Sequence, residues 1–134
     1  MLFETTRRVE FGDTDMAGIV HFANFFRYME AAETDFLRSL GLSVSWQEGG
    51  RRYGLPRVSA SCDYSKPARF GDLLTIAVTV EKVGTKSVTY RHEFSRDGVP
   101  LAVGRITAVY VEKTPDGGMR SADIPADFRA KLEG

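Results

Sequence analysis

The sequence has little cysteine and histidine. Among its 134 residues, Cys62 is the single cysteine, and His21 and His92 are the two histidines. One cysteine cannot form an internal disulfide, and this usage is typical of a reducing compartment, so we expect a cytoplasmic protein. The three residues do not have the spacing of a zinc site, so we expect no metal.

The sequence also lacks an excess of charge and any long apolar run. Lys plus Arg and Asp plus Glu both number 18, giving a formal net charge of zero. Nucleic-acid-binding proteins usually carry a basic excess, so we expect no nucleic-acid partner. No apolar run approaches the ~20 residues of a membrane-spanning helix, so we expect no membrane partner. The length and the 43% hydrophobic content predict one globular domain over residues 1–134.

Hydrophobic spacing predicts a strand, a long helix and then several strands. Residues 5–11 have the character of a short strand, and residues 12–18 form a loop rich in glycine and aspartate. Apolar residues recur every three or four positions from Phe22 to Leu40, which predicts a helix ended by Gly41. Residues 43–56 read as irregular. Period-two patterns predict strands at 58–64, 73–83, 87–94 and 101–111, and a short helix follows at 124–132.

The order of these elements predicts the fold class. Short turns between consecutive strands favour antiparallel pairing. A single helix with a wide apolar face has to bury that face against the sheet. We therefore predict an α+β fold in which one curved antiparallel β-sheet wraps around one long α-helix.

Elimination leaves one region for chemistry. No serine-nucleophile, phosphate-loop or dinucleotide-binding motif occurs. Cys62 falls inside a predicted strand, as a small buried hydrophobic residue would. The loop before the long helix contains Asp13 and Asp15, and aspartates in such loops commonly serve turn formation. Alternatively, a carboxylate beside a helix N-terminus, whose free N–H groups can hold an oxyanion, suits acyl transfer.

Residues 11–30, FGDTDMAGIVHFANFFRYME, resemble the signature of the hotdog-fold acyl-CoA thioesterases of the 4-hydroxybenzoyl-CoA thioesterase type. Weaker likeness continues through residues 67–76 and 83–92. The resemblance implies a hotdog fold and hydrolysis of an acyl-CoA thioester to a free acid and CoA. Because coenzyme A is then part of the substrate, no separate cofactor is implied.

The resemblance also implies roles for individual residues. It makes Asp15 the catalytic carboxylate, acting either as a nucleophile or as a general base. It makes the backbone N–H near Phe22 the oxyanion donor, and Gly18 the glycine that allows the loop to approach the thioester. It places Phe25 and Glu30 at the substrate pocket, although a core phenylalanine and an ordinary helix carboxylate are the alternatives.

One departure from the family bears on the substrate. A branch of the family has a catalytic histidine at the position of Phe22, whereas this chain has His21 one residue earlier. The departure disfavours an aspartate–histidine mechanism and leaves the part of His21 open. With Phe22 at this position, the motif resembles that of the branches that act on aromatic acyl-CoAs of the 4-hydroxybenzoyl or dihydroxynaphthoyl type.

The resemblance further implies a CoA site and an assembly. The basic cluster that binds CoA in the family corresponds to residues 84–87, where only Lys86 remains basic and Gly84 and Thr85 replace basic residues. The resemblance thus implies Lys86 and Ser87 as the CoA-binding residues. Family active sites lie between subunits, so we expect a homodimer that associates into a dimer of dimers, a homotetramer. A non-catalytic acyl-CoA-binding hotdog module is the alternative function, and a hotdog dehydratase, which needs an aspartate–histidine pair, is a third.

Overall fold

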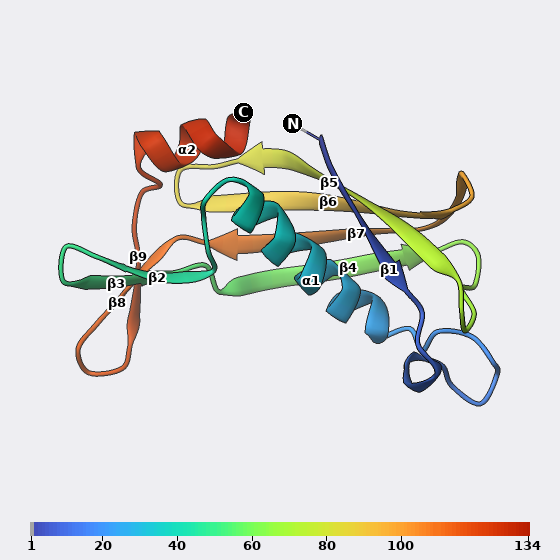
Figure 1. Cartoon of the computed structure of the whole chain (residues 1–134). Coiled ribbons are helices and arrows are strands. Elements are labelled where there is room, and N and C mark those ends of the chain that lie inside the picture. The colour runs from blue at the N-terminus through green and yellow to red at the C-terminus, as the bar shows by residue number, and fades with distance from the viewer. Residues whose placement is uncertain (1) are drawn as a thin grey trace.

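The computed structural model describes residues 2–134. In chain order, their elements are β1 (Leu2–Arg8), a 3-10 turn η1 (Phe11–Asp13), α1 (Asn24–Ser39), β2 (Ser45–Glu48), β3 (Arg51–Gly54), β4 (Arg57–Tyr64), β5 (Leu73–Val83), β6 (Ser87–Arg96), β7 (Val99–Val109), β8 (Val111–Lys113), β9 (Met119–Ser121) and α2 (Ala126–Glu133). Figure 1 shows α1 lying across one face of the main sheet. The predicted α+β architecture, with a sheet around one long helix, is confirmed.

The main sheet has the strand order β1-β5-β6-β7-β4, with every neighbouring pair antiparallel. β1 and β4 are therefore its edges. A smaller sheet has the order β2-β3-β8-β9, and Figure 1 shows it as an arm that projects from one end of the main sheet. The loop before α1 lies at the other end, so the two ends of the molecule carry different structures.

Helix α1 follows the predicted pattern with slightly narrower bounds. Its inward side chains, among them Met29, Phe36 and Leu37, are fully buried against the sheet. Gly41 ends the helix with φ of +74°, and the N–H groups of Gly41 and Leu42 donate to the carbonyls of Arg38 and Leu37. This paired arrangement is the Schellman motif, which explains why a glycine follows the last turn.

The prediction that residues 43–56 are irregular is wrong, because β2 and β3 form a hairpin there. The two strands have four residues each and are joined by Gly49 and Gly50, both at positive φ. Strands this short give no readable period of two. Trp46 stacks on Tyr53 across the pair, with ring centroids 5.7 Å apart.

The other predicted bounds need smaller corrections. The first strand is β1, which ends at Arg8 rather than at Phe11, because η1 begins there. The last predicted strand is divided at Tyr110 into β7 and β8, and β9 follows unpredicted. Strand β5 has the predicted bounds. Of the helices formed by residues 2–134, none has both the length and the apolar character that membrane crossing requires.

Candidate active site

Asp13 organises the loop that precedes α1. Its Oδ2 accepts hydrogen bonds from the Tyr28 hydroxyl and the Glu10 N–H, both at 2.9 Å. Its backbone carbonyl accepts from the His21 N–H at 2.9 Å and from Asn24 Nδ2 at 2.8 Å. Tyr28 is buried, and burial and the Asp13 hydrogen bond both raise the pKa of its phenol. Asp13 therefore joins η1 to the first turns of α1 and has a structural role.

Asp15 is oriented differently, since its side chain lines a cleft of about 440 Å³. Its Oδ1 accepts a hydrogen bond from the Ala17 N–H at 2.8 Å, which fixes the carboxylate on its own turn. The Asp15 N–H donates to the Ile19 carbonyl, closing the loop below it. The two aspartates, two residues apart, thus have separate tasks, and only Asp15 of the pair lines the cleft.

The turn from His21 to Asn24 leaves one backbone donor unused. The N–H groups of His21, Ala23 and Asn24 donate to the Asp13 carbonyl, His21 Nδ1 and the His21 carbonyl respectively. Within residues 2–134, the Phe22 N–H has no hydrogen-bond acceptor. Phe22 also lines the cleft with Asp15 and is 62% exposed. A free amide at a helix N-terminus is suited to hold a developing oxyanion.

Aromatic side chains form much of the cleft wall. Phe25 is buried, and its ring packs edge-to-face on Tyr64 and Phe94 with centroids 5.2 and 5.1 Å away. Burial raises the pKa of Tyr64 to about 12, so its hydroxyl stays protonated near neutral pH. The full lining is Asp15, Ile19, Val20, Phe22, Phe25, Tyr64, Ser65, Lys66, Pro67 and Ala68.

Two other predicted site residues do not line the cleft. Gly18 has φ of +81°, a backbone conformation that favours glycine, and its N–H donates to the Asp15 carbonyl. Glu30 is 65% exposed on α1, and its carboxylate lies 3.7 Å from the Arg57 guanidinium. The same Arg57 binds the fully buried Glu33 at 3.0 Å, and burial raises the pKa of Glu33.

The predicted CoA-binding residues lie far from Asp15 within one chain. Arg8, at the end of β1, pairs with Leu73, so the Asp15 loop starts beside the first residue of β5. Lys86 and Ser87 follow the last residue of β5, a strand of 11 residues. Eleven residues span roughly 33 Å at about 3.3 Å each. The structure therefore brings together Asp15, Phe22 and Phe25 but not Lys86 and Ser87.

Sequence reasoning missed three polar residues that line the cleft. Tyr64, Ser65 and Lys66 come from the end of β4 and the connection that follows. Only their position in the sequence could have indicated this role. They precede Pro67 at the end of a predicted strand, and functional side chains commonly gather in the loops that follow strands. The histidines lie apart: His21 stacks on Phe22, and His92 is fully buried on β6. Residues 2–134 contain no cluster of histidine, cysteine and acidic side chains that could hold a metal.

Residues 9–132 match the model of the thioesterase-like superfamily. The chain is 34% identical over 128 residues to the 4-hydroxybenzoyl-CoA thioesterase of Pseudomonas sp. (strain CBS-3), an alignment that covers 91% of each protein. A family match over nearly the full length includes every residue of the cleft.

Solved structures give the same result. A crystal structure of a 4-hydroxybenzoyl-CoA thioesterase mutant, complexed with 4-hydroxybenzoyl-CoA, superimposes with a TM-score of 0.85 and 27% identity over 98% of each chain. The 1,4-dihydroxy-2-naphthoyl-CoA thioesterase of Synechocystis superimposes with a TM-score of 0.83 and 26% identity, over 98% of this chain and 96% of that one.

Proposed function

The chain belongs to the thioesterase-like superfamily and is a hotdog-fold thioester hydrolase, and we propose that it hydrolyses an aromatic acyl-CoA to the free acid and CoA. The predictions of family, fold and reaction class are confirmed. Its relatives named above act on 4-hydroxybenzoyl-CoA and 1,4-dihydroxy-2-naphthoyl-CoA. An acyl group of this aromatic type is therefore the proposed substrate.

One observation carries the proposal: Asp15 and the unpaired N–H of Phe22 border the same cleft. Thioester hydrolysis needs a group that attacks the carbonyl or activates water. It also needs a donor for the negative oxygen that develops in the transition state. In the proposed reaction, Asp15 supplies the first as nucleophile or general base, and the Phe22 amide supplies the second.

The shape and chemistry of the cleft support an aromatic acyl group. Phe22, Phe25 and Tyr64 offer ring faces and edges, and Ile19 and Val20 add aliphatic surface. Aromatic rings pack favourably in offset and edge-to-face contacts, so a planar acyl group gains from such a wall. We propose that Gly18 keeps the loop beside the thioester in the conformation that this approach requires.

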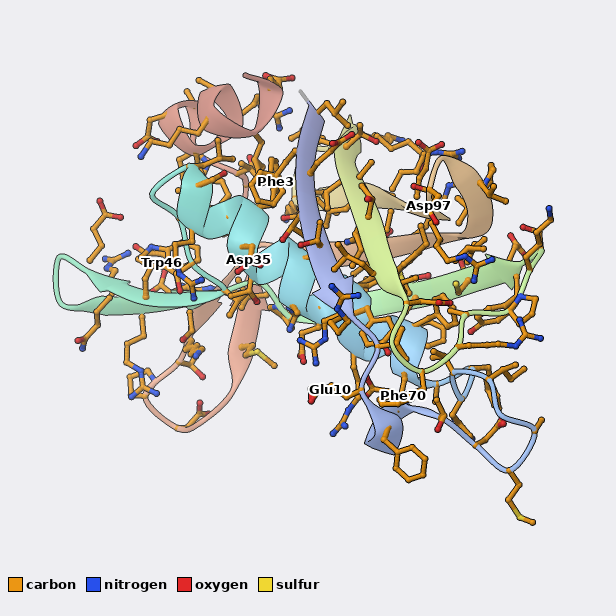
Figure 2. All side chains as sticks on the ribbon, turned by 45° about the vertical axis from the view of Figure 1, so that its right-hand side comes forward. Phe3, Glu10, Asp35, Trp46, Phe70 and Asp97 are labelled. Carbon is orange, nitrogen blue, oxygen red and sulfur yellow. The ribbon has the colours of Figure 1, made fainter. Side chains whose placement is uncertain are left out.

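Exposed apolar side chains support a homodimer as the active unit. Phe11, Met16, Phe22 and Phe70 are each more than 60% exposed at the end of the chain that carries the cleft. Figure 2 shows Phe70 and Glu10 together at this end and Trp46 away on the arm. Clustered exposed hydrophobic residues favour a partner surface. Strand β4 adds an exposed edge that a second copy can pair with.

A multi-chain site also gives the predicted CoA residues a role. Because Lys86 and Ser87 lie at the far end of β5 from Asp15, they can contact bound CoA only from a neighbouring chain. Lys86 is exposed and forms no salt bridge within residues 2–134, so its ammonium is free for a phosphate. We propose that Glu30 likewise acts in the substrate pocket of a neighbouring chain. We also propose a dimer of dimers as the complete assembly.

The test is thiol release from a panel of acyl-CoAs, comparing wild type with Asp15→Asn. We expect a preference for one aromatic ester and a loss of roughly 100-fold or more in kcat for the variant. Asp35→Asn is the matched control, because Asp35 pairs only with Arg38 on the exposed side of α1. Full activity of Asp15→Asn would exclude the proposed mechanism. Tight acyl-CoA binding without thiol release would instead support the non-catalytic binding module.

A further inference from the structure

Tyr64 connects the edge strand β4 to the turn that precedes α1. Its hydroxyl donates a hydrogen bond of 2.9 Å to the Phe22 carbonyl, across 42 residues of sequence. Its ring packs edge-to-face on Phe25 and lines the cleft. The side chain therefore contacts both the turn and the cleft wall.

The bond acts on the residue that carries the unpaired amide. The Phe22 carbonyl also accepts a hydrogen bond from the Phe25 N–H, but at 3.3 Å this is longer than the bond from Tyr64. His21 is fixed on the other side by the bond from its N–H to the Asp13 carbonyl. The Phe22 N–H shares its peptide plane with the His21 carbonyl, which accepts from the Asn24 N–H at 2.8 Å, so hydrogen bonds hold the backbone on both sides of this amide.

We infer that Tyr64 is a positioning residue for the oxyanion donor of the reaction, an inference that rests on the proposed function. Its hydroxyl aligns the Phe22 amide with the thioester and does not touch the reacting atoms. Loss of this alignment reduces transition-state stabilisation while leaving the aromatic wall in place, since phenylalanine keeps the ring.

The test compares Tyr64→Phe with Tyr53→Phe. Tyr53 is a partly buried tyrosine on β3 whose hydroxyl has no hydrogen-bond partner in residues 2–134. Its variant therefore removes a tyrosine hydroxyl without removing a hydrogen bond. We expect Tyr64→Phe to lower kcat roughly 10-fold with KM and Tm close to wild type, and Tyr53→Phe to leave kcat unchanged. An unchanged kcat for Tyr64→Phe, or a change confined to KM, overturns the inference. If the wild type releases no thiol from any ester, the proposed function itself fails.

A second inference comes from the arm formed by β2, β3, β8 and β9. Arg52 on β3 lies directly opposite Lys113 on β8, and Gln47 on β2 lies opposite Arg52. Directly paired residues share a face of the sheet, and like charges placed this way repel. The pair is destabilising unless an anion neutralises it.

The carboxylates of the arm do not neutralise this pair. Glu112 lies on the other face, where it contacts Arg51 at 3.5 Å and Arg120 at 3.9 Å. Within residues 2–134, neither Arg52 nor Lys113 has a carboxylate within 4.0 Å. One face of the arm is thus balanced in charge and the other is cationic.

The cationic face is also organised. Lys113 extends over Gly54, where a Cβ would lie 3.2 Å from its Cε, and its Nζ donates to Ser45 Oγ at 2.9 Å. A hollow of about 340 Å³ is lined by Ser45, Trp46, Gln47, Arg52 and Lys113. We propose that this hollow binds a phosphate group. Arg52 would supply a planar donor pair, Lys113 a point charge, and Ser45 and Gln47 neutral donors.

The test is calorimetric titration of the full chain with inorganic phosphate and with adenosine 3′,5′-bisphosphate. Arg52→Gln/Lys113→Gln removes two charges from the hollow, and Arg51→Gln/Arg120→Gln removes two from the opposite face. We expect the first variant to weaken binding about 10-fold or more and the control to stay near wild type. Binding of both probes that the first variant weakens indicates a general phosphate site, and such binding of the bisphosphate alone indicates a nucleotide site. No binding of either probe, or binding that the first variant weakens no more than the control does, overturns the proposal.

Discussion

At the scale of single residues, the two loop aspartates should separate stability from activity. Asp13 Oδ2 accepts two hydrogen bonds, one from the buried Tyr28, whereas Asp15 Oδ1 accepts one from its own turn. We expect Asp13→Ala to lower the free energy of unfolding by about 1–3 kcal/mol because it leaves the Tyr28 hydroxyl without its acceptor. Asp15→Asn should cost less than about 0.5 kcal/mol. Urea denaturation of both variants measures this, and equal losses would contradict it.

His92 should make stability depend on pH. The ring is fully buried, and neither nitrogen has a partner at hydrogen-bonding distance and angle within residues 2–134. Burial lowers the pKa of His92 from 6.5 to about 4, and the Met29 backbone offsets only part of this effect. As pH falls below 6.5, His92 becomes protonated in the unfolded chain but stays neutral in the folded chain. The free energy of unfolding therefore decreases until about pH 4. The total loss is about 3 kcal/mol.

Unfolding of wild type and His92→Gln from pH 7 to 4.5 measures this contribution. The glutamine is polar and does not titrate, so the variant should lose less stability over that range than the wild type. Parallel curves for the two proteins would show that the folded state protonates His92 as readily as the unfolded chain does.

At the scale of elements, α1 packs tightly on the sheet at Gly104 on β7. A Cβ at this position would overlap Met29 Sδ and lie 3.2 Å from the Ser61 carbonyl oxygen. We expect Gly104→Ala to destabilise the fold by about 1–3 kcal/mol through overpacking. Combining it with Met29→Ala should cost less than the sum of the two single changes, because the second change removes the overlap. Additive costs in thermal unfolding would exclude this contact as the cause.

The elements show what sequence could predict and what it could not. The three- and four-residue spacing of α1 and the alternation of β5 are long patterns set by burial on one face, so their bounds were predictable. The arm was missed because β2 and β3 have four residues each and are stabilised by contacts distant in sequence, such as Trp46 on Phe128 at 5.5 Å.

The site residues also divide into those that a local pattern predicts and those that only the fold brings into place. Asp15, Phe22 and Phe25 fall within one continuous signature, and the structure brings them to one cleft. Tyr64, at the end of β4, and Lys66, in the connection after it, reach that cleft through tertiary packing, which no local pattern encodes. The sequence also could not predict the distance between Lys86 and Asp15, because this distance depends on which end of β5 each residue lies beside.

At the scale of the whole molecule, the exposed edge of β4 should be required for dimer formation. Val58 on this strand is 62% exposed, and a charge on an edge strand opposes pairing with another chain. We expect Val58→Asp to shift the protein toward monomer in light scattering at micromolar concentration. Val99→Asp, at a 37% exposed valine beginning β7, should leave the assembly intact. A wild-type protein that is already monomeric would refute the proposed dimer.

Mixed oligomers can reveal whether one chain completes the site of another. The separation of Asp15 from Lys86 along β5 predicts that Asp15 of one chain works with Lys86 of a neighbour. When Asp15→Asn and Lys86→Glu chains are unfolded and refolded together in equal amounts, random association gives about a quarter of the sites both native residues, since each residue is native with a chance of about one half. Thiol release at low acyl-CoA concentration should then exceed the mean of the two separate variants. Activity equal to that mean would place both residues of each working site in the same chain, or leave Lys86 without a role in binding CoA.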